Sequence, residues 1–275
     1  MGGKHIKVNL GADGVAIVTF SRPPVNAFNT VMWQEIPKVF DNLSLDPAVR
    51  VVVLASTERA FTGGIDLKDI ADFFQEGDDS ARIALQFRPL IFQFQNAINS
   101  IENCRVPVIA AVHGFAFGLG VDILSACDVR YATEDATFSV KEVDIGMAAD
   151  VGSLARFPKT VGNDSSAREI AVTARIFSAK EAEAIGFVSK LVPGGKREVL
   201  DAALVTAKEI ATKSPIAVAG TKHVLLHSRD HTALENLDYV ATWNAVMFQT
   251  ADTTEAINSF LQKRRPRFGP LASKL

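Results

Sequence analysis

The chain has 275 residues, of which 48% are hydrophobic and 22% charged, a composition typical of a globular protein long enough to bury a large core. Its formal net charge is −2 and its sequence pI is about 6.2. These values speak against a general nucleic-acid or membrane-surface binder, which needs a strong positive field, so we expect a small-molecule partner.

Short apolar segments predict strands in the first half of the chain, at residues 15–20, 51–55 and 106–112, because each is rich in β-branched residues. Between the last two, apolar residues recur at three- and four-residue spacing from Leu90 to Cys104 and predict an amphipathic helix. A strand, a helix and a strand in succession imply parallel pairing, so the predicted fold class is α/β.

The second half of the chain has a different pattern. From about Asp201 the strand signals fade, and an alanine-rich, charge-bearing pattern predicts helices up to about Lys263, with Pro215 in the first turn of one of them. We therefore expect one α/β core, residues 1–200, followed by a helical C-terminal region, residues 201–275.

The chain lacks the patterns of several other classes of protein. Cys104 and Cys127 are too few for a disulfide framework, and no Cys/His cluster has metal-ligand spacing, so we expect a reducing compartment and no metal. No run approaches the roughly 18 apolar residues of a membrane span, and the first residues resemble neither a secretory nor a transit signal. The last three residues, Ser273-Lys274-Leu275, have the form of an address read by the peroxisomal import receptor, which predicts a peroxisomal protein.

Two glycine-rich turns have the chemistry to hold a negatively charged oxygen. Residues 60–67 (AFTGGIDL) follow the second predicted strand, and their adjacent glycines let backbone amides come close to a ligand. Residues 113–122 (HGFAFGLGVD) lie between a strand and a helix start, where unpaired amides meet the positive end of the helix dipole. A purely structural role fits the first of these turns equally well. Neither GxGxxG nor the phosphate-binding GxxxxGK pattern is present, which speaks against nucleotide binding.

The chain resembles the crotonase (enoyl-CoA hydratase/isomerase) family at these turns and over nearly its whole length. The segments that carry the likeness are RPPVNAF at 22–28, AFTGGIDL at 60–67, VPVIAAVHGFAFGLGVDILSACDVRYA at 106–132, and 138–162. The resemblance implies a spiral of ββα turns with a helical trimerisation region, and a homotrimer or homohexamer. It also implies an acyl-CoA thioester as the substrate and no separate cofactor, because coenzyme A is part of that substrate.

The resemblance also implies the residues of a binding site. Family members hold the thioester carbonyl with two backbone amides, which fall here at Gly63 and Leu119. The family usually has glycine at the position of Leu119, so its side chain must turn away from the ligand. The expected substrate and coenzyme A site is formed by Val25, Asn26, Ala27, Phe28, Thr62, Gly63, Gly64, Ile65 and Asp66.

Three carboxylates, Asp122, Glu142 and Asp150, bear on the type of reaction. Hydratases of the family have two glutamates that flank a water, at the positions of Asp122 and Glu142 here. Asp122 is one methylene shorter than glutamate, which weakens the hydratase interpretation. Asp150 stands where hydratases typically have glycine, and the trio with the string EVDIGMAADVG resembles the branch of the family that isomerises 3,5-dienoyl-CoA to 2,4-dienoyl-CoA in fatty-acid β-oxidation.

That isomerisation requires proton transfer at two carbons several bonds apart, so one ionised and one protonated carboxylate suit it better than a single group. We expect Glu142 to take the proton next to the thioester carbonyl and Asp150 to donate at the sixth carbon. A continuous helix would hold these two acids about 12 Å apart. Gly146 predicts that the chain bends instead, and Asp122 is expected to tune or orient the other two.

Other functions remain open on the sequence. One is an enoyl-CoA hydratase or an isomerase of a single double bond. Another is a catalytically silent relative that serves as an acyl-CoA binding or assembly module. Without the resemblance, Asp122 would be interpreted as a helix cap and the other two acids as exposed loop charges. His113 is expected to be a hydrogen-bonded structural histidine.

Overall fold

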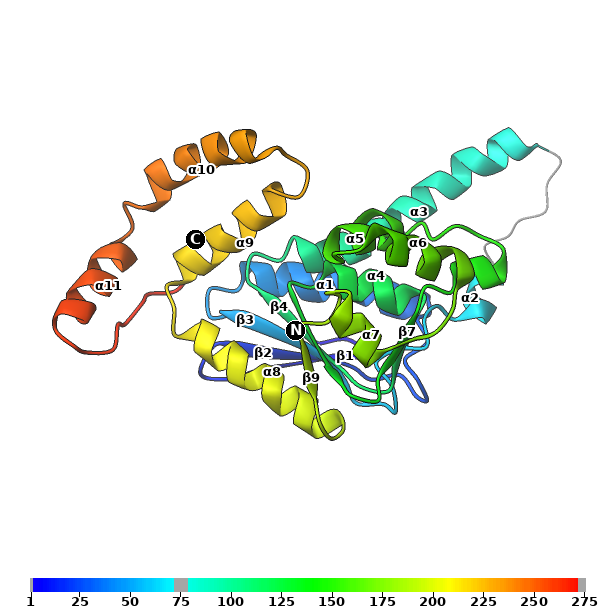
Figure 1. Cartoon of the computed structure of the whole chain (residues 1–275), viewed down its shortest axis with the longest axis horizontal. Helices are drawn as coiled ribbons and strands as arrows, with labels where there is room; N and C mark the ends of the chain where they lie inside the picture. Colours follow the sequence, from blue (N-terminus) through cyan, green and yellow to red (C-terminus); the bar gives the residue numbers. More distant parts are fainter. Residues whose placement is uncertain (1, 72–78, 272–275) are drawn as a thin grey trace.

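The computed structural model describes residues 2–71 and 79–271, so the Ser273-Lys274-Leu275 tripeptide lies outside the described residues. It contains two sheets covered by helices (Figure 1). The strands are β1 (Ile6–Leu10), β2 (Val15–Phe20), β3 (Val51–Ser56), β4 (Val108–Val112), β5 (Phe115–Phe117), β6 (Val129–Thr133), β7 (Thr137–Ser139), β8 (Phe177–Ser178) and β9 (Lys190–Val192). The helices are α1 (Thr30–Leu45), α2 (Leu67–Ala71), α3 (Ser80–Glu102), α4 (Leu119–Ala126), α5 (Ser153–Thr160), α6 (Asp164–Thr173), α7 (Ala179–Ala184), α8 (Lys196–Ala211), α9 (Pro215–His227), α10 (Ala233–Met247) and α11 (Ala251–Leu261).

The larger sheet has six strands in the order β1-β2-β3-β4-β6-β9. Only the β1–β2 pair in it is antiparallel, and the other neighbours are parallel. The predicted strands correspond to β2, β3 and β4. The predicted parallel pairing of β3 with β4 is confirmed, and β2 is also parallel to β3. The smaller sheet, β5-β7-β8, includes Phe115–Phe117 of the second glycine turn.

The core lies on both faces of the larger sheet, because successive side chains of a strand point to opposite faces. Val52 and Leu54 of β3 belong to the main apolar cluster, which helices α1, α3 and α4 complete. Val51 and Val53 of the same strand face the other way and pack with Val199 and other apolar residues of α8. Every residue of β3 is therefore buried, as expected for a central parallel strand.

The C-terminal helices α9, α10 and α11 project away from the sheets at one end of the molecule (Figure 1). Pro215 is the first residue of α9, as predicted. The predicted division after residue 200 falls inside α8, and this helix packs on the sheet with the core. Lys222 of α9 is buried and lies 2.8 Å from the Asp128 carboxylate, so one ion pair fixes the start of the projecting region to the core.

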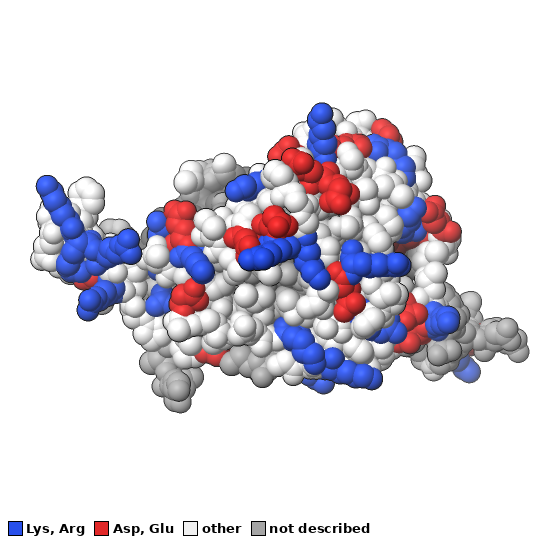
Figure 2. Space-filling model, turned by 90° about the horizontal axis from the view of Figure 1, so that it is seen from below, with Lys and Arg blue, Asp and Glu red and all other residues white. Residues whose placement is uncertain are grey.

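The surface agrees with the small net charge. On the face shown in Figure 2, basic and acidic side chains are interspersed, and basic ones gather on the projecting end. Within residues 2–71 and 79–271, no helix combines the length and the apolar character needed to cross a bilayer.

Candidate functional site

The two predicted glycine turns lie against each other. The Thr62 amide donates to the Phe115 carbonyl at 3.1 Å, and the Phe117 amide donates to the Thr62 carbonyl at 3.2 Å. Gly64 has φ of +89°, and a Cβ there would lie 2.8 Å from the Phe117 carbonyl oxygen. A residue without a side chain is therefore required where the turns meet.

The two expected oxyanion donors have different surroundings. Leu119 is the first residue of α4, so helix geometry gives its N–H no acceptor. Its side chain is 2% exposed and packs in the main core, as the predicted turning away requires. The Gly63 amide instead donates to the Val25 carbonyl at 2.8 Å. A thioester oxygen would have to share or replace that bond, and the oxyanion role of both amides stays a prediction.

The structure brings the three predicted carboxylates to one cavity. Asp122 lies in the first turn of α4, Glu142 begins the 3₁₀ turn Glu142–Ile145, and Asp150 lies just before α5. All three line a cavity of about 280 Å³ together with Gly63 and Leu119. Gly146 ends the 3₁₀ turn in the left-handed conformation, with φ of +81°, so the predicted bend between Glu142 and Asp150 is present.

The cavity has apolar walls. Besides the carboxylates and the glycine turns, Lys141 and Asp144 line it and form an ion pair with each other at 2.8 Å. Its apolar lining residues are Ile65, Leu67, Phe117, Ile145, Met147 and Val151. Most of these residues could not be recognised from the sequence, because an apolar residue in a loop carries no signal that separates a ligand pocket from the core.

Burial dominates the electrostatics of the acids. It raises the pKa of Asp122 to about 6, although a hydrogen bond of 2.5 Å from the Ser153 amide and the charge of Arg156 oppose the shift. Burial, and then repulsion by Asp122, raises the pKa of Glu142 to about 7. Burial also raises the pKa of Asp150. Ionisation of these neighbouring acids is therefore harder than that of exposed carboxylates, and the charge on one opposes ionisation of the next.

This arrangement suits acid–base chemistry. A carboxylate with a pKa of about 7 is a stronger base than an ordinary glutamate and still ionises near neutral pH. The Oε2 atom of Glu142 is buried and has no hydrogen-bond partner among the described residues, so it is free to accept a proton from a ligand.

The segment expected to bind coenzyme A is held by buried polar contacts. Asn26 is fully buried, and its side-chain amide donates to the Ser56 hydroxyl at 2.7 Å and to the Phe61 carbonyl at 3.0 Å. The Thr62 hydroxyl donates to the Asn26 carbonyl at 2.7 Å. Asn26, Thr62 and Phe28 are thus inside the protein, where they shape the segment, while Val25 and Ala27 are partly exposed.

Two charged residues near the site have structural partners. The Asp66 carboxylate accepts a hydrogen bond from the Arg22 guanidinium at 2.7 Å, which ties the first glycine turn to the segment at residues 22–28. The Nε2 atom of His113 lies 2.8 Å from the Glu58 carbonyl oxygen, and burial lowers the pKa of this histidine, as expected for a structural residue. Among the described residues, no group of His, Cys, Asp and Glu has the arrangement of a metal site.

The fold and the shared cavity of amides and acids are those of a crotonase-fold protein that acts on a thioester. The chain belongs to the enoyl-CoA hydratase/isomerase family, whose sequence model matches residues 11–270. It is 47% identical over 264 residues to the human mitochondrial delta(3,5)-delta(2,4)-dienoyl-CoA isomerase, an alignment that covers 95% of this chain and 80% of the relative.

Two further comparisons extend the likeness. The peroxisomal delta(3,5)-delta(2,4)-dienoyl-CoA isomerase of Arabidopsis thaliana is 44% identical over 250 residues, covering 90% of this chain and 89% of the relative. The crystal structure of a putative enoyl-CoA hydratase from Streptomyces coelicolor superposes with a TM-score of 0.87 at 29% identity, covering 96% of this chain and 94% of the other. The crotonase fold class expected from the motifs is confirmed.

Proposed function

We propose that the protein isomerises 3,5-dienoyl-CoA to 2,4-dienoyl-CoA in the β-oxidation of unsaturated fatty acids. The observation that carries the proposal is a third carboxylate, Asp150, in the cavity that already contains Glu142 and Asp122. The names of the human and Arabidopsis relatives support the same reaction.

In the proposed mechanism the amides of Gly63 and Leu119 hold the thioester oxygen. Ionised Glu142 takes a proton from the carbon next to the carbonyl, and the electrons of that C–H bond enter an extended enolate whose charge reaches the sixth carbon. Protonated Asp150 then donates its proton to the sixth carbon, which gives the 2,4-diene. Glu142 ends protonated and Asp150 ionised, so both return to their starting states by proton exchange with solvent after the product leaves.

Asp122 acts through its charge. It is 1% exposed and lies beside Glu142, and its repulsion is the second largest cause of the raised Glu142 pKa. An ionised Asp122 therefore makes Glu142 a stronger base. Each well-placed amide contributes about 3 kcal/mol to stabilising the enolate oxygen, by comparison with measured oxyanion sites.

The test is turnover of a purified 3,5-dienoyl-CoA, followed by the absorbance of the conjugated product. Glu142→Gln and Asp150→Asn should each lower kcat by about 10²- to 10⁴-fold, the usual contribution of a positioned general acid or base. Glu134→Gln, which changes an exposed acid outside the cavity, is the control and should keep full activity. Full activity in both of the first two variants would show that the roles are wrongly assigned.

The same preparation separates the alternatives. Hydration of crotonyl-CoA well above any diene turnover would identify a hydratase, and faster shift of one isolated double bond would identify a simple enoyl-CoA isomerase. Tight acyl-CoA binding without turnover would identify a silent binding module. The proposed reaction only moves a proton within the substrate, so activity should survive exhaustive dialysis against a chelator, with no added cofactor.

The oligomer is proposed to be a homotrimer or homohexamer built on the C-terminal helices. The support is the number of large apolar side chains that a single chain leaves exposed there, including Leu234, Val246, Phe248 and Phe260, which are 67–83% exposed. Sedimentation equilibrium gives the mass directly. A monomer at micromolar concentration would refute this part of the proposal.

The location is proposed to be the peroxisome, through recognition of Ser273-Lys274-Leu275 by the import receptor. The name of the Arabidopsis relative supports this compartment, whereas the human relative is named as mitochondrial. A fluorescent protein fused to the N-terminus should enter peroxisomes, and deletion of Leu275 should leave it in the cytosol. Unchanged peroxisomal import after the deletion would count against the signal.

A further inference from the structure

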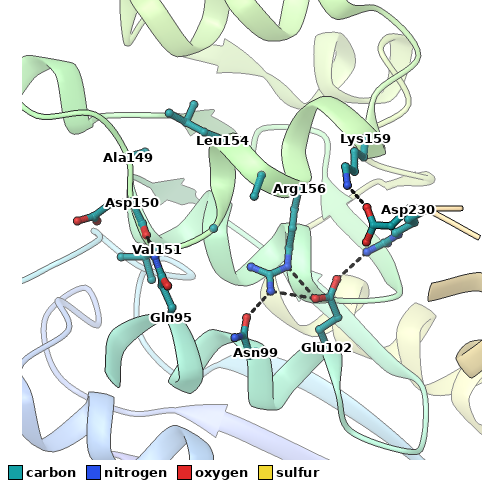
Figure 3. A pocket seen from close by; sticks show the side chains of 13 residues that line it. Gln95, Asn99, Glu102, Ala149, Asp150, Val151, Leu154, Arg156, Lys159 and Asp230 are labelled. Atoms are coloured by element: carbon teal, nitrogen blue, oxygen red, sulfur yellow. Dashed lines mark hydrogen bonds and ion pairs between the residues drawn. The ribbon is translucent and has the colours of Figure 1, made fainter. Parts of the chain in front are cut away.

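A second cavity adjoins the first one. It has a volume of about 400 Å³, and Asp150 and Val151 line both cavities, so this short segment is the wall between them. In Figure 3 the Asp150 side chain turns to the side opposite Arg156, which enters the second cavity from α5. The proposed mechanism gives Arg156 no role.

Arg156 is held firmly in the second cavity. Its side chain is only 13% exposed. Its Nη2 atom donates to the Asn99 Oδ1 atom at 2.5 Å, and its Nε atom donates to the Glu102 Oε2 atom at 2.9 Å (Figure 3). The other oxygen of Glu102 accepts a hydrogen bond from Arg229 at 2.7 Å. Both anchors of Arg156 belong to α3, so the guanidinium is fixed relative to the core.

Gly152 separates this guanidinium from Asp122. A Cβ at Gly152 would lie 2.3 Å from the Arg156 Nη1 atom and 3.8 Å from the Asp122 Oδ1 atom, so these two atoms are no more than about 6.1 Å apart. Opposite charges at such a distance favour the ionised form of the acid. The next residue, Ser153, donates its amide to the same Asp122 oxygen at 2.5 Å.

The other charged groups around Asp122 are negative or already paired. Glu142 and Asp150 face it from the same cavity and repel its charge. Lys141, which also lines that cavity, binds Asp144, and Lys159 of α5 binds Asp230. From α3, Glu102 is shared by Arg156 and Arg229, and neither β5 nor β7 has a charged residue.

We infer that Arg156 is a positioning residue for Asp122: it packs against Gly152, which precedes the amide that binds the carboxylate, and supplies the positive charge that keeps this buried acid ionised beside Glu142. The inference rests on the proposed function only where it concerns turnover. It requires glycine at position 152, since any side chain would displace the guanidinium. Glu102 and Asn99 fix the direction of the charge.

The test compares two variants that each remove one positive charge from α5. The active state has Glu142 ionised beside an ionised Asp122, so Arg156→Gln should move the acid limb of the kcat/KM profile for a 3,5-dienoyl-CoA to higher pH by about one unit, which lowers kcat/KM about tenfold below the limb. Lys159 lines the same cavity but pairs with Asp230, so the acid limb of the Lys159→Gln variant should stay at its wild-type pH. Arg156→Lys keeps the charge, so its acid limb should stay close to the wild-type position.

A second readout does not depend on turnover. The infrared band of protonated Asp122, assigned by its loss in Asp122→Asn, should titrate at higher pH in Arg156→Gln than in the wild type or in Lys159→Gln. If the diene is not a substrate, this measurement still tests the inference, and the failure of the proposed function is seen separately. An unchanged Asp122 titration in a folded Arg156→Gln would overturn the inference.

Circular dichroism identifies a variant that does not fold. In that case Asn99→Ala replaces Arg156→Gln, because it removes one anchor of the guanidinium and leaves every charge in place. It should shift the Asp122 titration in the same direction by a smaller amount. No shift in Asn99→Ala would then refute the positioning role.

Discussion

Replacement of Asp122 by asparagine is expected to stabilise the folded protein at high pH, although it impairs catalysis. Burial raises the pKa of Asp122 from its ordinary value of 3.8 to about 6. The folded state therefore binds the proton more tightly than the unfolded state. Stability is highest below the unfolded pKa and is lost as the pH rises through the folded one. Ionisation of Asp122 then costs about 3 kcal/mol of folding free energy at pH 8 and about half as much at pH 5.

Asparagine has no charge to bury, and its oxygen can still accept the hydrogen bond from the Ser153 amide. The advantage of the variant over the wild type should therefore grow by about 1–2 kcal/mol between pH 5 and pH 8, whatever constant amount the buried amide adds or removes. Urea unfolding at the two pH values, at one protein concentration, measures this difference. Asp201→Asn, which changes an exposed acid of α8, should show almost none. An advantage that stays constant or shrinks toward pH 8 would refute the electrostatic argument.

Three further predictions concern other parts of the protein. The kcat/KM for a 3,5-dienoyl-CoA should rise as the pH increases through about 7, because Glu142 must lose its proton to act as the base; a profile flat from pH 5.5 to 8 would exclude that role. Gly118→Ala should lower the free energy of unfolding by about 1–3 kcal/mol and should lower kcat, because Gly118 has φ of +50° and a Cβ there would lie 3.2 Å from Glu142 Oε1. In denaturant unfolding the control is Gly162→Ala, whose added Cβ would meet no atom within 4 Å. Lys222→Met should lower the free energy of unfolding by about 2–3 kcal/mol, because it leaves Asp128 without its ion-pair partner. Lys213→Met, which breaks an exposed ion pair, should lower it by less than about 0.5 kcal/mol. Equal urea unfolding midpoints for the two variants would contradict this prediction.

The parts of the fold that local pattern determines could be predicted. The segment from Val51 onward is a buried parallel strand because its β-branched run fits no other element, and Pro215 begins a helix because it needs no amide partner there. The start of α3 could not be predicted in this way. Its first turns are mostly exposed, so burial against the core does not set where it begins. The helix begins at the Asp79 side chain, which accepts hydrogen bonds from the amides of Ala81 and Arg82.

The candidate site was predictable where the chemistry lies in short sequence motifs. Asp122, Glu142 and Asp150 were predicted from the resemblance, and the structure places them in one cavity. Residues that act through distant partners gave no such signal. Arg156 meets Glu102 across 54 positions of sequence, so no spacing rule relates the two. The bond from the Gly63 amide to the Val25 carbonyl likewise depends on how two loops meet, which residue types alone do not specify.

The buried side chain of Asn26 has a consequence for how the protein selects its substrates. Its hydrogen bonds join the segment at residues 22–28 to the end of β3 and to the first glycine turn, which restrains these three parts relative to one another. Little ordering of the backbone is then needed when a thioester arrives, and its affinity for the common coenzyme A part should vary little from one acyl group to the next. Discrimination between acyl chains is left to the apolar cavity walls around Phe117, Met147 and Val151. Substitutions that repack these walls should leave the binding of the thioester group unchanged.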